Sequence, residues 1–158
     1  MDIPGPVGAL EADFSAGATP ARGHAVLCHP HPLYGGSMHD AVLGCVSDAL
    51  LSAGVSCLKF NFRGVGASEG RHDGRGGEVE DLGAALAWLL AEPPDGVPVT
   101  SLWLCGYSFG AHVVWQYLAR QASGTGRAHA LASSAGGRVA RVLLVAPPVG
   151  PMAFPSCS

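Results

Sequence analysis

The sequence predicts an α/β fold in which a mostly parallel sheet is flanked by helices. Four short apolar runs, each apolar on both faces and rich in Val and Leu, alternate with longer amphipathic segments. This alternation is typical of parallel strands covered by helices on both sides. Of the 158 residues, 48% are apolar and 13% are charged, which predicts a single globular domain over residues 1–158.

The four apolar runs are the predicted parallel strands, at residues 24–28, 55–62, 101–105 and 139–146. Residues 3–14 precede them, alternate weakly and contain turn residues. We therefore expect a small antiparallel hairpin at one edge of the sheet.

Three amphipathic segments between these runs are the predicted helices. The first starts in a capping-box-like segment, residues 37–40, and stops at Gly54. The second has three acidic residues near its positive end, within 78–81, and stops before Pro93. The third covers about residues 109–121. The next segment, at about 123–137, is rich in Gly, Ser and Ala, and we expect a flexible insertion there.

The charge pattern argues against several classes of partner. The formal net charge is −3 and Lys59 is the only lysine, so the clustered cations of a nucleic-acid-binding protein are missing. The longest apolar stretch, residues 82–91, is too short to span a bilayer. The first residues lack the pattern of a secretory signal, so we expect a cytoplasmic protein with no membrane or nucleic-acid partner.

The cysteines favour a structural role over a chemical one. The five cysteines are odd in number and form no C-x-x-C pair. Three of them, Cys28, Cys57 and Cys105, fall in the apolar runs, so we expect small buried hydrophobes in a reducing compartment. The alternatives are a thiol nucleophile or a zinc site, and the ligand spacing of a metal site is absent.

The strongest motif is the segment GYSFG at residues 106–110, which fits G-x-S-x-G. It follows a predicted strand and precedes a predicted helix, the context in which this motif presents a nucleophilic serine. A sharp turn would expose the Ser108 hydroxyl, and glycines on either side would allow the close approach of backbones. The following helix N-terminus would direct N–H groups toward a developing oxyanion. The alternative is an ordinary glycine-rich turn.

The loop after the first parallel strand, residues 28–38, is a candidate for the second oxyanion donor. Pro30 and Pro32 have no N–H, so the backbone N–H of His31 is our candidate. For the side chains of His29 and His31 we favour a structural role over catalysis. A metal site formed by these histidines with the two residues 39–40 is a further alternative, although the spacing is not that of a known zinc site.

The segment FRGVGASEG at residues 62–70 follows the next strand. It contains G-x-G, but neither the G-x-G-x-x-G fingerprint nor a Walker lysine, which argues against a nucleotide loop. We expect a structural loop near the rim of a pocket, held by hydrogen bonds from Arg63.

Four segments together resemble the small, capless bacterial-type α/β-hydrolases, which are similar to dienelactone hydrolases and serine aminopeptidase-like hydrolases. These segments are HPHPLYGGSM at 29–38, NFRGVGASEG at 61–70, GYSFG at 106–110 and APPV at 146–149. The resemblance covers roughly residues 3–150. It implies an α/β-hydrolase sheet from the first hairpin to the sixth strand.

The same resemblance implies the roles of three residues. Ser108 would be the nucleophile, and the backbone N–H groups of Phe109 and His31 would form the oxyanion hole. The substrate would be a small acyl compound, such as a carboxylic ester, and no cofactor or metal would be needed.

The sequence departs from this family after Ser108. The family places an acid and then a histidine after the nucleophile, but no Asp or Glu follows Asp95, and neither His112 nor His129 matches the family position. The chain thus resembles a hydrolase that lacks its last strands and is truncated at the C-terminus. We expect impaired activity, because a serine without a base is a weak nucleophile.

The departure also leaves other functions open. Without a neighbour, the strand at 139–146 would expose an apolar edge to another protein or to a second copy. A non-catalytic hydrolase-like protein that binds a partner there is the alternative to an enzyme. Completion of the site by another chain is a third hypothesis.

Overall fold

The computed structural model describes residues 1–148, apart from residues 19–20, 73, 75 and 124–138. The described elements follow the chain as β1 (Asp2–Gly5), β2 (Gly8–Ser15), β3 (Gly23–Cys28), the 3₁₀ helix η1 (Pro32–Tyr34), α1 (Ala41–Ser52), β4 (Val55–Phe60), α2 (Gly77–Ala91), β5 (Leu102–Tyr107), α3 (Phe109–Ala122) and β6 (Val139–Val145). The α/β class predicted from the sequence is confirmed. Most of the expected insertion at 123–137 lies outside the described residues.

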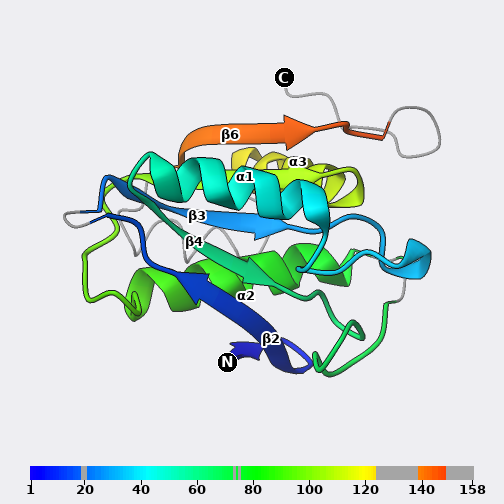
Figure 1. Ribbon diagram of the computed structural model, residues 1–158. Helices are drawn as coiled ribbons and strands as arrows, with labels where there is room; N and C mark the ends of the chain where they lie inside the picture. The colour runs from blue at the N-terminus through cyan, green and yellow to red at the C-terminus, as the bar shows by residue number, and fades with distance from the viewer. Residues whose placement is uncertain (19–20, 73, 75, 124–138, 149–158) are drawn as a thin grey trace.

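The strands form one mixed sheet with the order β1-β2-β4-β3-β5-β6. The hairpin of β1 and β2 is antiparallel, as expected, and β2 also runs antiparallel to β4. From β4 to β6 every pairing is parallel. The carboxyl ends of these four strands therefore meet at one edge of the sheet, on the right in Figure 1.

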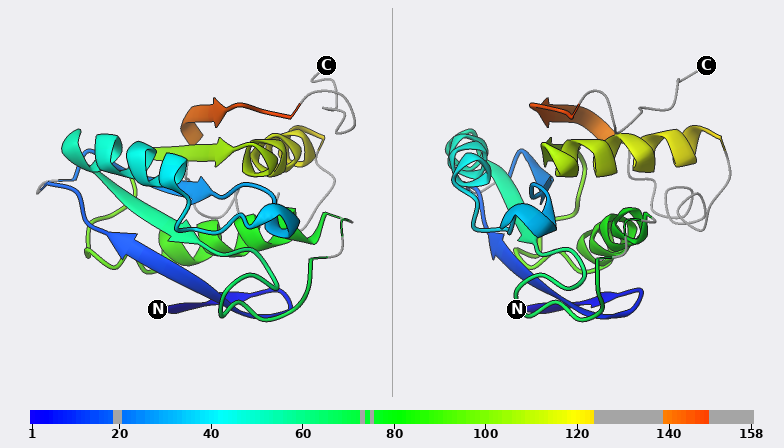
Figure 2. Two further views of the ribbon diagram at one scale, coloured as in Figure 1. Left: turned by 45° about the vertical axis from the view of Figure 1, so that its right-hand side comes forward. Right: turned by 90° about the vertical axis from the view of Figure 1, so that its right-hand side faces the viewer.

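The helices form one layer on each face of the sheet. Figure 2 shows α1 on one face, with α2 and α3 on the other. Side chains alternate between the two faces along each strand. In β3, Ala25 and Leu27 pack with the core under α1, whereas Val26 and Cys28 pack with the larger core under α2 and α3. This alternation explains why the central strands are apolar on both faces.

The hydrogen bonds explain where the first helix begins and why the second parallel strand is shorter than predicted. The first helix begins at Ala41, directly after the segment 37–40 in which we expected its start, because the Asp40 carboxylate caps it by accepting from the N–H groups of Val42 and Leu43 at 2.8 and 3.4 Å. The second parallel strand ends at Phe60 and not at Phe62. There the chain leaves the sheet, and the N–H of Phe62 donates to the His29 ring.

The cysteines in the strands are core residues, as predicted. Cys28, Cys57 and Cys105 are buried, and burial raises the pKa of Cys57 to about 11 and that of Cys105 to about 12. Cys45 is exposed on α1, and Cys157 lies outside the described residues. The three buried thiols are thus protonated at neutral pH and poor nucleophiles.

The last described strand has one neighbour among the described residues. β6 pairs with β5, and two of its apolar side chains are partly exposed, Val142 at 43% and Leu143 at 38%. No helix in the described part of the chain is both long and apolar enough to cross a membrane.

Candidate functional site

The predicted nucleophile lies at the junction between β5 and α3. The strand ends at Tyr107 and the helix begins at Phe109, so Ser108 alone makes the turn. Its φ is 52° and its ψ is −114°, and Ala146 is the other non-glycine residue with positive φ among the described residues. Such a conformation costs on the order of 1–3 kcal/mol in a non-glycine residue and is concentrated at functional sites. The half-buried serine is therefore held in a strained turn at the carboxyl edge of the sheet.

The two glycines of the motif are required by close packing. A Cβ on Gly106 would lie 2.5 Å from the carbonyl carbon of Gly110. A Cβ on Gly110 would collide with the carbonyl oxygen of Cys28, at the end of β3. The serine turn is thus pressed directly against the loop that follows β3.

The start of α3 supplies N–H groups beside Ser108. The Ser108 carbonyl already accepts from Ala111 and His112, at 3.0 and 3.3 Å, and the Ser108 N–H donates to the Val145 carbonyl. The N–H of Phe109 belongs to the first turn, where no intrahelical carbonyl can accept it. This is the position expected of an oxyanion donor.

The loop after β3 brings His31 to the same place. His31 caps η1, with its Nδ1 accepting from the N–H of Leu33 at 3.2 Å. Its ring packs against the Phe109 ring with 4.8 Å between centroids. The structure thus brings together the two residues predicted to supply oxyanion donors.

His29 has a structural role. It is fully buried; its Nδ1 contacts the Pro30 carbonyl at 2.7 Å, and its Nε2 accepts from the N–H of Phe62 at 3.1 Å. These contacts need the neutral ring with its proton on Nδ1. Burial lowers the pKa of His29 to about 4. The ring braces two loops of the site, as favoured from the sequence, and both of its nitrogens are engaged.

The low pKa of His29 predicts a loss of stability in mild acid. The His29 ring takes up a proton near pH 6.5 in the unfolded chain and only near pH 4 in the folded chain. The contribution of neutral His29 to the free energy of unfolding is therefore fully present above pH 6.5 and is lost as the pH falls toward 4. The expected loss from this residue is about 3 kcal/mol. Urea unfolding at several pH values checks it: His29→Gln should flatten the curve in this window, and an unchanged slope would contradict the assignment.

The metal-site alternative gains no support from the described residues. They contain no group of three or more His, Cys, Asp or Glu side chains that could hold a metal ion. Asp40, one of the proposed ligands, instead caps α1.

The loop after β4 is held by a buried ion pair, as predicted for Arg63. Its guanidinium contacts the Asp81 carboxylate at 2.7 Å, and its own N–H donates to the same carboxylate at 3.0 Å. The Asp81 hydrogen bonds raise the pKa of Arg63 further. Asn61 fastens the loop on its other side, accepting from Met38 N–H at 2.8 Å and donating to Glu11 at 2.7 Å.

A His–carboxylate pair that was not predicted from the sequence lies close to the serine turn. Nδ1 of His72 lies 2.6 Å from an oxygen of Glu78, which is 1% exposed. The His72 ring contacts the rings of His31 and Phe109, with centroids 5.1 and 5.7 Å apart. The available signal was helical spacing: Glu78 lies three and four residues before Asp81 and Leu82, on the buried face of α2.

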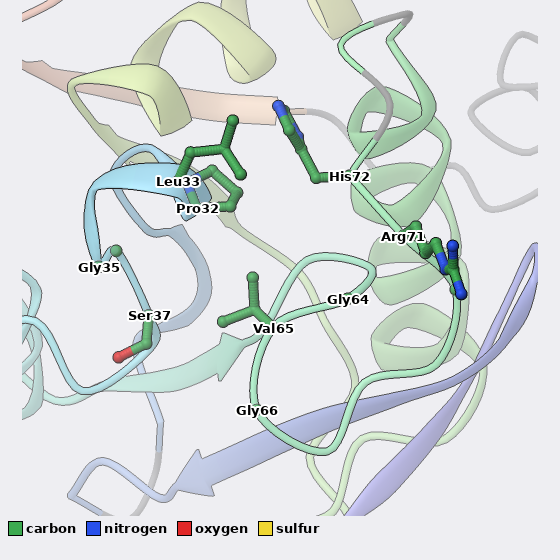
Figure 3. A pocket seen from close by; sticks show the side chains of 11 residues that line it. Pro32, Leu33, Gly35, Ser37, Gly64, Val65, Gly66, Arg71 and His72 are labelled. Atoms are coloured by element: carbon green, nitrogen blue, oxygen red, sulfur yellow. The ribbon is translucent and has the colours of Figure 1, made fainter.

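A cleft of about 470 Å³ opens between the two loops of the site (Figure 3). It is lined by residues of the loop after β3 (Pro32, Leu33, Gly35, Gly36 and Ser37) and of the loop after β4 (Gly64, Val65, Gly66, Gly70, Arg71 and His72). Ser108 does not line it. His72 connects the cleft to the turn, because it lines the cleft and touches Phe109.

A His–Asp pair, His24 with Asp95, lies at the opposite end of the sheet from Ser108. His24 Nε2 lies 3.1 Å from Asp95, which also accepts from the Ser56 hydroxyl at 2.7 Å. His24 pairs with Leu102 at the start of β5, whereas Ser108 follows the end of that strand. At a rise of roughly 3.3 Å per residue, the two ends are about 20 Å apart. This group is structural.

Comparison with known proteins agrees with this architecture. The α/β serine hydrolase homologue from Coxiella burnetii is 36% identical, with a TM-score of 0.79 over 98% of this chain and 65% of its own. XC6422 from Xanthomonas campestris, described as an α/β serine hydrolase without a lid, is 33% identical, with a TM-score of 0.75 over 98% and 63%. The chain belongs to the α/β-hydrolase superfamily.

The mostly parallel sheet and its flanking helices are thus those of an α/β-hydrolase fold. The uncharacterized protein RP471 of Rickettsia prowazekii (strain Madrid E) is 39% identical over 117 residues, which are 74% of this chain and 48% of that protein. No protein-family model matches the chain. The chain spans about half the length of the Rickettsia protein and just under two thirds of the two solved hydrolases.

Proposed function

We propose that the chain is a serine hydrolase in which Ser108 attacks the carbonyl carbon of a carboxylic ester or related acyl bond. The observation that carries the proposal is the φ of 52° at Ser108, between a strand and the start of a helix. A turn of this kind is the one by which the G-x-S-x-G motif presents its serine hydroxyl beside the next backbone N–H, and this supports the proposal. The solved relatives described as serine hydrolases support the same chemistry.

The proposed reaction forms an acyl-serine ester. Ser108 Oγ bonds to the carbonyl carbon and its proton passes to solvent water, and the bond to the leaving group breaks as that group takes up a proton from solvent water. Backbone N–H groups of Phe109 and His31 stabilise the oxyanion. Water then hydrolyses the acyl-serine ester and releases the acid.

We expect slow turnover from this chain. No Asp or Glu follows Asp95, and His112, in the first turn of α3, has its Nε2 engaged with the Gln116 side chain at 2.7 Å. A serine site without its base and acid keeps only the binding and oxyanion contributions to the rate. Slow chemistry favours a test by covalent capture of the serine.

The test is labelling with a fluorophosphonate probe, read by intact-protein mass. The folded wild-type chain should take up one phosphonyl group, and Ser108→Ala should reduce labelling to background. Ser52→Ala, which removes an exposed serine at the end of α1, is the matched control and should label normally. A folded wild-type chain that resists the probe, or a Ser108→Ala chain that labels equally, would overturn the proposal.

Partner binding through β6 is the second candidate function. Among the described residues β6 pairs with β5 alone, and Val142 and Leu143 are partly exposed on it. An unpaired apolar edge is a template for association. We expect the mass of the wild-type chain in solution to rise with concentration, and Leu143→Lys to return it to that of a monomer.

The matched control for Leu143→Lys is Val7→Lys, because Val7 is 48% exposed in the turn between β1 and β2. It should associate like wild type. Light scattering after size exclusion measures all three chains. A wild-type chain that is monomeric at every concentration would count against this function.

A further inference from the structure

The pairing of His72 with the Glu78 carboxylate favours one tautomer of the His72 ring. Glu78 is buried in the first turn of α2, where the helix N-terminus favours a negative charge. An ionised carboxylate can only accept a hydrogen bond, so with Glu78 as the carboxylate the 2.6 Å contact places the proton of the neutral His72 ring on Nδ1. In the neutral ring, Nε2 is then a hydrogen-bond acceptor.

This acceptor is not used inside the described protein. His29, by contrast, uses both of its ring nitrogens in hydrogen bonds within the protein. Among the described residues, the His72 side chain makes one hydrogen bond, the one between Nδ1 and Glu78. The His72 side chain is 13% exposed and lines the cleft. The structure therefore holds an oriented imidazole at the cleft with one nitrogen available to a ligand.

The remainder of the cleft indicates what kind of ligand fits. Pro32, Leu33 and Val65 contribute apolar side chains, and Leu33 is 74% exposed. Figure 3 shows His72 across from Pro32 and Leu33, whereas the guanidinium of Arg71 points away from the other lining residues. These apolar side chains beside the His72 acceptor suit a neutral, mainly apolar compound with a hydroxyl or N–H group, and the Ser37 hydroxyl and the glycine backbones add further polar atoms to the lining.

We propose that His72, oriented by Glu78, is a substrate-binding residue that accepts a hydrogen bond from a hydroxyl or N–H group of an apolar ligand in this cleft. The contact of His72 with Phe109 places that ligand beside the serine turn. The identification of the ligand as the alcohol or amine part of an acyl substrate rests on the proposed serine hydrolase function. The binding site itself does not.

The test compares two probes that differ in their ability to donate a hydrogen bond, benzyl alcohol and benzyl methyl ether. Both are titrated into the Ser108→Ala chain with ¹⁵N-labelled histidines, at mildly alkaline pH. The alcohol should shift the Nε2 resonance of His72 and bind about 2- to 10-fold more tightly than the ether, as expected for one net hydrogen bond. The proposal is overturned if the two probes bind equally or if neither binds.

Variants separate binding from structure. His72→Asn keeps an N–H donor toward Glu78 but has no acceptor at the position of Nε2, so the preference for the alcohol should vanish. Glu78→Gln still accepts from Nδ1 and should retain most of the preference. His39→Gln, at an exposed histidine outside the cleft, should retain all of it. A preference that survives in His72→Asn would also overturn the proposal.

The outcome is independent of the fluorophosphonate test. If Ser108 fails to label while the alcohol preference is present, the proposed function is wrong and the binding site stands. If Ser108 labels while the preference is absent, the binding site alone is wrong.

Discussion

Replacement of Gly110 by alanine is expected to lower the free energy of unfolding by on the order of 3 kcal/mol and to reduce labelling of Ser108. The added Cβ would collide with the Cys28 carbonyl, which is backbone and cannot rotate away. The loop after β3 must then move away from the serine turn, and the His31 contact with Phe109 would be lost with it. Urea unfolding and the rate of phosphonylation measure the two effects.

Gly44→Ala is the matched control for this change. Gly44 lies within α1, and a Cβ there would have no atom within 4 Å. Because alanine is the better helix former, this variant should be about 0.5–1 kcal/mol more stable than wild type. Equal stability of the two variants would contradict the close packing that we assign to Gly110.

The second large effect is expected from Asp81→Asn. The substitution keeps the shape of the side chain but leaves Arg63, whose side chain is 7% exposed, without the buried carboxylate that pairs with its guanidinium. Removing one partner of a buried pair costs about 3–5 kcal/mol. Because Arg63 and Asp81 join the loop after β4 to α2, we also expect the cleft to lose its shape and the preference for benzyl alcohol to weaken.

Asp13→Asn provides the comparison at the surface. Asp13 contacts Lys59 at 3.1 Å, but its side chain is 47% exposed, and pairs of this kind contribute at most about 1 kcal/mol. Chemical unfolding of both variants checks the difference. Similar losses for Asp81→Asn and Asp13→Asn would show that burial of the Arg63 pair is not what stabilises the loop.

The fold was largely predictable because the central strands are buried on both faces. Runs such as residues 25–28 are apolar throughout, which is typical of a parallel strand between two helical layers. The serine turn was predictable for a related reason, since Gly106 and Gly110 stand where backbones touch. In both cases the local sequence pattern, an apolar run or a pair of glycines, is the same feature that the packing of the folded chain requires.

The parts that escaped prediction depend on contacts between distant segments. The residue that caps α1 could not be identified within residues 37–40, because Ser37 and Asp40 are both good caps. Only the three-dimensional position of the loop selects Asp40. The pair of His72 and Glu78 was missed because acidic residues in a first helical turn are usually solvated. Burial of Glu78 on the inner face of α2 follows from packing, which charge patterning alone does not reveal.

The central claim is that Ser108 is presented as a nucleophile toward acyl compounds, and an acylation experiment tests it most directly. The chain is mixed with p-nitrophenyl acetate, nitrophenolate release is followed in time, and the acetylated residue is located by peptide mass. The account predicts a stoichiometric burst with the acetyl group on Ser108, absent from Ser108→Ala. Acetylation confined to Lys59 or the N-terminal amine, and unchanged in Ser108→Ala, would contradict it.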